Sequence, residues 1–400
     1  MGAAVAATKP HCWRILIVST LAIGLPSNAA VLPEDRADAL YHRYEGGGVT
    51  IDGPSVLMRK QIGNRISVSG KYYVDSISSA SIDVESYASP YTEERTETSA
   101  GIDILNDKTI ISLAYTNSSE NDYEANTGAI AISHDMFGDL TTLALTYSVG
   151  MDDVFRTTEV GDGSGERERD SDFAEEVTRY NYAVTLSQIL TPSLIMSLSF
   201  NSVAEEGHLN NPYRQVRFLD PSHPDGFDLQ TENDKYPTTR TSQAAAIRAK
   251  YFLPYRAAIG AEYRTYTDNW GISASNYKLD YTHTLANGWI FDIRYRFYTQ
   301  DQADFYSDLF PHRDAQNLMA RDKELSTYTS TTIGLGASYE IMRSGWGIFD
   351  KGSLNVAYDR INFDYDNFRD IRNPETSDPG EEPLYSFDAD VWQLYLSLWY

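Results

Sequence analysis

The sequence predicts an all-β protein, a transmembrane antiparallel up-and-down β-barrel, and three observations support this. The first is the last strand, in which Trp392, Leu394, Leu396, Leu398 and Tyr400 occupy every second position. An extended backbone places all five side chains on one face. A final strand with an unbroken apolar face and a terminal aromatic residue is typical of outer-membrane barrels, in which it closes against the first strand.

The second observation is that the same alternation recurs along the chain. Apolar residues take alternate positions over 66–74, 143–149, 180–200, 291–297 and 333–341. A tilted strand needs about 10 residues to cross a bilayer, and these segments lie within stretches of that length.

The third observation is that the connecting segments alternate in length. Short turns are expected near 63–64, 106–107, 136–138, 191–192, 254 and 287–288. Longer links lie between them, near 77–94, 151–176, 205–237, 301–325 and 366–386. A soluble β-sandwich has no reason to sort its loops in this way, whereas membrane barrels have short periplasmic turns and long outer loops.

The strand count depends on the start of the chain. Fifteen candidate strands follow residue 49, and a barrel with both ends in the periplasm needs an even number. We predict sixteen, with residues 39–46 supplying one more; fourteen is the alternative, if one weak segment is not a strand. Residues 30–48 are thus either a first short strand or a periplasmic segment with a short helix that starts at 33–35 and ends at the glycines 46–48. Residues 49–400 form the barrel, with no second domain.

The first 29 residues are predicted to be a signal peptide. Lys9 and Arg14 precede an apolar stretch at 15–25, and small residues follow, so we expect cleavage after Ala29. The single cysteine, Cys12, is removed with this segment, which excludes disulfides and cysteine-bound metal from the mature chain.

Composition narrows the function classes. Removal of residues 1–29 leaves 31 basic residues against 57 acidic, a net charge of −26. Nucleic-acid binding is therefore not expected, because phosphate contacts need clustered Lys and Arg. The 29 Tyr, 15 Phe and 6 Trp exclude a disordered chain. Aromatic residues near strand ends are assigned to the interfacial belts of the barrel: Trp270, Trp289, Trp346, Trp399 and Tyr400.

Ionisable residues gather on the predicted inner face of the strands around 245–300. If Ile247 and Tyr251 face lipid, Arg248 and Lys250 point into the lumen. The same reasoning turns seven further residues inward: Glu262, Arg264, Lys278, Asp280, Asp292, Arg294 and Arg296. They form either a basic track for anionic solutes or a network that pairs across strands and stiffens the wall. We favour the network, because acidic residues are interspersed with the basic ones.

The link at 205–237 mixes apolar, basic and amide groups, as long functional loops do. Its candidate contact residues are Glu205, Glu206, His208, Asn210, Asn211, Tyr213, Arg214 and Arg217. The segment either folds into the mouth as a constriction or forms an external cap, and we favour the cap.

Catalytic and metal motifs are weak. The sequence contains neither an HExxH motif nor a GxSxG nucleophile elbow. We therefore expect no catalytic residues, no metal and no cofactor, and we do not expect an enzyme.

Four blocks resemble the bacterial family of domain of unknown function 3570: residues 32–48, 49–55, 88–95 and 207–214. The resemblance implies an outer-membrane barrel, without residue roles to transfer. Members tend to be encoded beside a small lipoprotein and a flavin-transferring periplasmic enzyme, which implies an envelope redox or export assembly.

These observations lead to three functional hypotheses for a protein of the Gram-negative outer membrane. The first is a channel, or the outer-membrane component of a transport, secretion or redox system. The second is a closed scaffold or receptor that docks a periplasmic or lipoprotein partner, and the third is an outer-membrane hydrolase. The expected partners are outer-membrane lipid, lipopolysaccharide and the barrel-assembly machinery.

Overall fold

The computed structural model describes residues 30–79, 91–159, 167–210, 212–231, 235–342, 345–372 and 377–400. The predicted signal peptide and Asn211 lie outside these residues. No described helix has the length and apolar character needed to cross a membrane.

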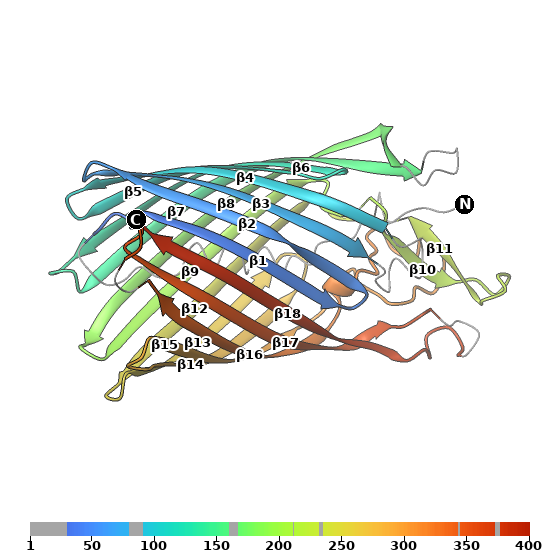
Figure 1. Cartoon of the computed structure of the whole chain (residues 1–400). Helices are drawn as coiled ribbons and strands as arrows, with labels where there is room; N and C mark the ends of the chain where they lie inside the picture. The colour runs from blue at the N-terminus through green and yellow to red at the C-terminus, as the bar shows by residue number, and fades with distance from the viewer. Residues whose placement is uncertain are drawn as a thin grey trace.

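Sixteen antiparallel strands form one closed barrel, which confirms the predicted fold class and strand number (Figure 1). The first nine strands are β1 Arg36–Gly46, β2 Val49–Ile62, β3 Ile66–Ser79, β4 Tyr91–Asn106, β5 Thr109–Ser119, β6 Tyr123–Met136, β7 Thr141–Glu159, β8 Arg167–Thr191 and β9 Leu194–Gly207. The barrel continues with β12 Thr239–Leu253, β13 Ala257–Asp268, β14 Ser273–Thr284, β15 Trp289–Gln300, β16 Tyr328–Ile341, β17 Lys351–Arg369 and β18 Leu384–Trp399. Each strand pairs with its neighbours in sequence, apart from the closing pair β1–β18 and the pair β9–β12.

The remaining two strands, β10 and β11, form a small hairpin outside the barrel sheet. Strands β10 Gln215–Leu219 and β11 Phe227–Thr231 pair with each other in the link between β9 and β12. A single turn of 3-10 helix, η1 Lys323–Leu325, lies in the link between β15 and β16. The residues 30–48 contain strand β1 and no described helix.

The last strand closes the barrel against the first. Leu394 lies opposite Tyr41 of β1, and Leu398 lies opposite Ala37. The Tyr400 hydroxyl donates to the backbone carbonyl of Arg59 (3.0 Å), so the chain ends tied to β2. Both ends of the barrel sequence therefore lie at the same rim, which we call the turn end; the opposite rim, with the long links, is the loop end.

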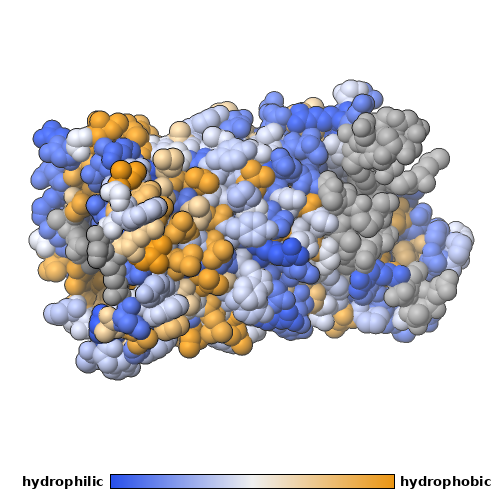
Figure 2. Space-filling model, in the orientation of Figure 1, coloured by the Kyte–Doolittle hydropathy of each residue, from blue (hydrophilic) through white to orange (hydrophobic). Residues whose placement is uncertain are grey.

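The outer surface carries an apolar band. Leu198, Ile293 and Leu335 expose more than half of their side chains, although they are aliphatic. Figure 2 shows that the apolar side chains of the visible face lie mostly toward the turn end, whereas the wall toward the loop end is largely hydrophilic. Such exposure is unfavourable in water and favourable against lipid tails, so this band is the membrane-facing part of the wall.

The band ends at an aromatic and charged girdle. The ring of Trp392 packs on Tyr358, with 4.4 Å between the ring centroids. Beside them, Arg360 pairs with Asp388 and with Asp390, at 2.6 Å each. Aromatic rings followed by ionised groups mark the boundary between lipid and water.

Three details of the link assignment from sequence were wrong. Residues 151–176 are mostly strand, because β7 runs to Glu159 and β8 begins at Arg167. Glu205 and Glu206 belong to β9 rather than to the following link. Trp270 is not in an interfacial belt, because it is 4% exposed within a largely aromatic cluster of loop and strand residues. Strands that continue beyond the bilayer have no lipid on one face, so they lose the apolar alternation that reveals strands in the sequence.

Candidate functional site: the lumen and its loop-end cap

Three links at the loop end pack together into one unit, which we call the cap: residues 208–238, 301–327 and 370–383, as far as they are described. Its small apolar core contains Val216, Phe310 and Met319, each at most 1% exposed. The hairpin is joined to the second link, because the amide of Phe310 donates to the Arg217 carbonyl and the amide of Leu219 donates to the Phe310 carbonyl (2.9 Å each).

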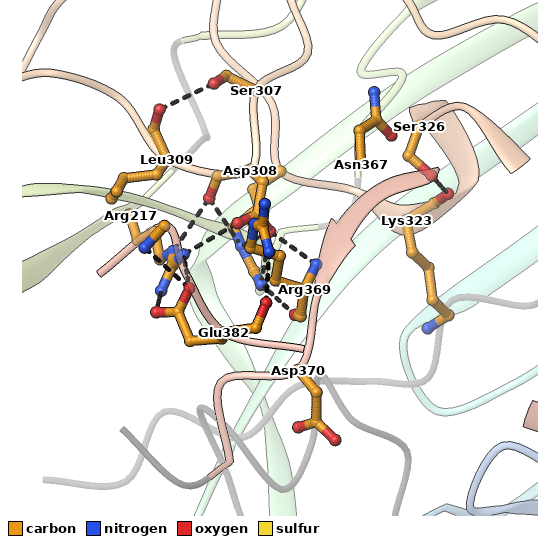
Figure 3. A network of polar contacts seen from close by, with 12 residues as sticks. Arg217, Ser307, Asp308, Leu309, Lys323, Ser326, Asn367, Arg369, Asp370 and Glu382 are labelled. Carbon is orange, nitrogen blue, oxygen red and sulfur yellow. Dashed lines mark hydrogen bonds and ion pairs between the residues drawn. The ribbon is translucent and has the colours of Figure 1, made fainter. Parts of the chain in front are cut away.

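A buried ionic network holds the three links of the cap together (Figure 3). The Arg217 guanidinium donates to both carboxylate oxygens of Glu382, at 2.6 and 3.0 Å, and to Asp308 at 2.9 Å. Arg321 also pairs with Asp308 (3.0 Å) and donates to the backbone carbonyl of Arg369 (2.9 Å). Planar guanidinium groups suit this role because they bind carboxylates through two parallel hydrogen bonds.

The charge of Glu382 is stabilised by this arrangement. Burial of the carboxyl raises its pKa, but the hydrogen bonds and positive charge of Arg217 outweigh burial, and the pKa lies below its ordinary value. The amide of Gly380 donates a further hydrogen bond to the same carboxylate (2.8 Å). Glu382 is therefore ionised at neutral pH.

The cap also contacts the inner surface of the barrel. Its residues Phe305 and Tyr236 form an aromatic cluster with Trp270 of the short link between β13 and β14, with ring centroids 5.3–5.6 Å apart. This cluster packs on lumen-facing aromatic residues of β13, β15, β16, β17 and β18, which are Tyr266, Tyr298, Tyr328, Phe363 and Phe387. Aromatic packing thus anchors the cap to one side of the mouth.

On the other side of the mouth, the cap reaches β7. The Tyr213 hydroxyl accepts a hydrogen bond from the Thr157 amide at 2.6 Å. The next residue, Arg214, pairs with Asp322 (3.1 Å) of the second link. The segment containing these residues therefore extends across the mouth from β7 to the other links.

The remaining predicted contact residues have separate positions. Glu205 pairs with Arg179 of β8 (2.8 Å) on the inner face of the barrel. Glu206 lies opposite Thr178 and Thr239 in the sheet. His208 packs its ring edge-on to Phe173, 5.3 Å away. Asn210 follows β9 at the start of the cap. Tyr213, Arg214 and Arg217 therefore join the first link of the cap to β7 and to the other two links.

Below the cap, charged side chains from β12–β17 line one side of the lumen. Ile247, Tyr251 and Ile293 are exposed on the lipid side, so the alternating positions face inward. We call this surface the basic wall, and its charged members are Arg248, Lys250, Glu262, Arg264, Lys278, Asp280, Asp292, Arg294, Arg296 and Asp359. It contains six basic residues and four carboxylates, although the whole chain has a net charge of −24.

Several charges of the basic wall are paired. The Arg248 guanidinium donates to Glu262 (2.7 Å) on the neighbouring strand. Arg294 pairs with Asp359 at 2.9 Å, across the intervening strand β16. Asp292 accepts a hydrogen bond from Thr282 (2.6 Å).

The register explains how Arg294 and Asp359 meet. Both lie opposite Gly334, one on each side of it. A Cβ atom at Gly334 would overlap the Asp359 carboxylate and come within 2.9 Å of Arg294 Nε. Glycine is therefore required at this position for the ion pair to lie flat across β16.

We expect Gly334→Ala to displace this pair and to lower the free energy of unfolding by about 1–3 kcal/mol, as overpacking does. The matched control is Gly150→Ala in β7, where an added Cβ would make only ordinary contacts of 3.4 Å and longer. Urea unfolding of both variants in lipid vesicles measures the difference. Equal stability of the two variants would contradict the steric argument.

The wall facing β15–β17 is lined differently. In the closed sheet, β5 stands eight strand positions from β15, which places it diametrically opposite. Because Leu113, Ile130 and Leu145 face lipid, the alternate positions of β5–β8 face the lumen. These positions in mid-barrel are small and uncharged: Ala114, Ala129, Ala131, Thr146, Ser148 and Ala183. In mid-barrel, the charged lining of β12–β17 thus faces small neutral residues of β5–β8, whereas β2–β4 carry further charged pairs, Arg59–Asp103 and Lys71–Glu97.

Sequence reasoning missed a buried cluster beside the closing strands. His42 contacts Asp75 at 2.8 Å and stacks on the ring of Tyr73. Arg95 pairs with the other oxygen of Asp75 (3.0 Å). The inward parity of β1, β3 and β4 predicts the direction of these side chains, but their mutual contact depends on the register between the strands.

Only one group of described carboxylates is arranged to hold a metal ion. Oxygens of Glu93, Glu120 and Asp122 lie within 4.8 Å of one another at the loop end.

The family model "Protein of unknown function (DUF3570)" matches residues 82–351, more than half of the chain. The chain belongs to the DUF3570 family. Within this family it is an outer-membrane β-barrel protein, because a closed barrel with a lipid-facing apolar band leaves no unpaired strand edge in the bilayer. No curated protein matches the sequence.

Solved structures with a similar fold are also outer-membrane barrels. A bacterial polysaccharide outer membrane secretin is 7% identical, with a TM-score of 0.48, over 92% of this chain and 99% of that one. The siderophore receptor PirA from Acinetobacter baumannii is 9% identical, with a TM-score of 0.44, over 84% of this chain and 53% of the receptor. The outer membrane protein OprD from Pseudomonas aeruginosa is 10% identical, with a TM-score of 0.38, over 92% and 95%. At these identities and scores, none of them indicates a function for this DUF3570 protein.

Proposed function

We propose that the protein is an outer-membrane channel that favours small anionic solutes and whose mouth is narrowed by the cap. The observation that supports this is the lining of the lumen. A net-positive wall faces a wall of small neutral side chains, in a chain that is strongly acidic overall. Barrels of this strand number enclose an aqueous space, so the charges of the wall act directly on passing ions.

The small residues on the opposite wall keep the lumen open to solvent. Alanine, serine and threonine leave room for solvent, whereas long charged side chains on both walls would fill the lumen and pair across it. The positive excess therefore stays next to water, where it attracts anions and repels cations.

The test is the reversal potential of the purified protein in a planar bilayer under a KCl gradient. The expected result is a preference for chloride, which Lys250→Gln/Arg264→Gln reduces. The control, Lys108→Gln/Lys351→Gln, removes two charges near the turn end and is expected to keep the preference. A cation-selective wild-type channel would overturn the proposal.

A closed barrel that docks a partner is the second candidate, and the extent of the cap favours it. The cap reaches from β7 to the side of the mouth formed by β13–β18. Absence of conductance in the wild type and in a variant with a loosened cap would support this alternative.

A further inference from the structure

We propose that Arg264, Lys278 and Arg296 form a binding site in the lumen for a phosphate-type dianion. This inference rests on the proposed channel function and adds a discrete site to it. The three cations lie on the adjacent strands β13, β14 and β15, and we call them the three-cation cluster.

The sheet register brings the cluster together. Lys278 lies directly opposite Arg296. Arg264 lies directly opposite Asn276, which is two positions before Lys278 on β14. Side chains at directly opposed positions of antiparallel strands have Cβ atoms about 5 Å apart. The cluster therefore places three positive charges within the reach of one small ligand.

Two carboxylates lie near the cluster: Glu262, which is directly opposite Lys278 on β13, and Asp280 on β14. Glu262 accepts hydrogen bonds from Arg248 (2.7 Å). Asp280 lies over Gly260, where a Cβ atom would overlap its carboxylate. Among the described residues, no carboxylate oxygen pairs with Arg264, Lys278 or Arg296 within ion-pair distance.

Like charges at directly opposed positions destabilise a sheet, so a bound counter-ion would relieve the repulsion between Lys278 and Arg296. Asn276 orients part of the cluster, because its amide oxygen accepts a hydrogen bond from Arg296 Nε at 2.5 Å. The guanidinium is also held 5.5 Å from the ring of Tyr298. The remaining guanidinium donors, the Asn276 amide and the Lys278 ammonium are left for an anion.

The donor set indicates the class of ligand. Two guanidinium groups can each bind a tetrahedral oxyanion through paired hydrogen bonds, and the ammonium acts as a point charge. Three positive charges match a dianion better than a monovalent anion such as chloride. Inorganic phosphate is the simplest probe, and succinate carries the same charge on two separated carboxylates.

The experiment measures phosphate binding in two ways. Isothermal titration of the full-length mature protein in detergent should show binding of phosphate, and phosphate added to chloride should briefly interrupt single-channel currents. In the double variant Lys278→Gln/Arg296→Gln, the phosphate affinity measured by titration and that measured by current interruption should each fall by about tenfold or more. The reason is that each charged hydrogen bond contributes substantially to binding. Lys108→Gln/Lys351→Gln should bind as the wild type does.

The outcomes separate this site from the channel proposal. Phosphate binding without conductance would support the site and reject the channel. Anion-selective conductance with equal phosphate binding in the wild type and in Lys278→Gln/Arg296→Gln would reject the site and leave the channel. Stronger binding of succinate than of phosphate would overturn the assignment of the ligand class. Retained heat-modifiable migration in gels verifies that each variant is folded.

Discussion

Arg217→Met is expected to detach the cap from its anchoring network and to raise the channel conductance. The substitution leaves Glu382, which is only 2% exposed, without its cation, and leaves Asp308 paired with Arg321 alone. Removal of one partner from a buried ionic group typically costs about 3–5 kcal/mol. The loss falls where the three links of the cap meet, beside its small apolar core of four buried residues, so the packing of the links against one another should loosen. The outer links should therefore become accessible to added protease.

The control is Arg372→Gln, which breaks the exposed pair between Arg372 and Asp370 in the same region. Exposed ion pairs contribute about 0–1 kcal/mol, so the cap should remain in place. Limited proteolysis of both variants in lipid vesicles reports on the cap independently of any conductance. Unchanged protease resistance in Arg217→Met would show that the ionic network does not hold the cap.

Ile293→Arg is expected to destabilise the barrel by about 2–4 kcal/mol, the cost of an arginine at the middle of the lipid-facing surface. Ile293 lies midway along the outward face of β15 and is 53% exposed. Its cross-strand neighbours Tyr281 and Leu335 offer no carboxylate partner at this position. Urea unfolding in lipid vesicles measures the effect.

Thr299→Arg is the matched control. Thr299 has the same outward parity on the same strand, but it lies near the loop end, between Ser275 and Thr329. An arginine near the interface costs about 0–1 kcal/mol. Equal destabilisation by the two substitutions would mean that the apolar band does not face lipid.

The fold was predictable because the barrel repeats one local rule. Each residue of a membrane-spanning strand faces either lipid or the lumen, and this choice is written in the sequence as an alternation of residue types. The closing strand illustrates this: Trp392 and Leu394 are both about half exposed on the outer face. The same rule gave the direction of Arg248, Arg294 and their neighbours.

The cap was only partly predictable. The length and composition of the link after β9 indicated a functional segment, and Arg217 was among its candidate residues. Its partners Asp308 and Glu382 are 91 and 165 residues away in the sequence. Nothing local marks such partners, because loops outside the bilayer do not follow the alternation.

The sequence by itself determined the barrel, its lipid-facing surface and the inward direction of the charged residues, and it favoured sixteen strands over fourteen. These follow from the chemistry of two solvents, lipid and water, acting on single positions of an extended chain. The tertiary structure decided which charges neutralise each other and which remain free. The register between strands determines which charges pair. Arg294 meets Asp359 only because both flank Gly334 on the strand between them. Lys278 and Arg296, by contrast, are placed opposite each other. Pairing between distant strands is a property of the closed sheet, and no single strand contains it.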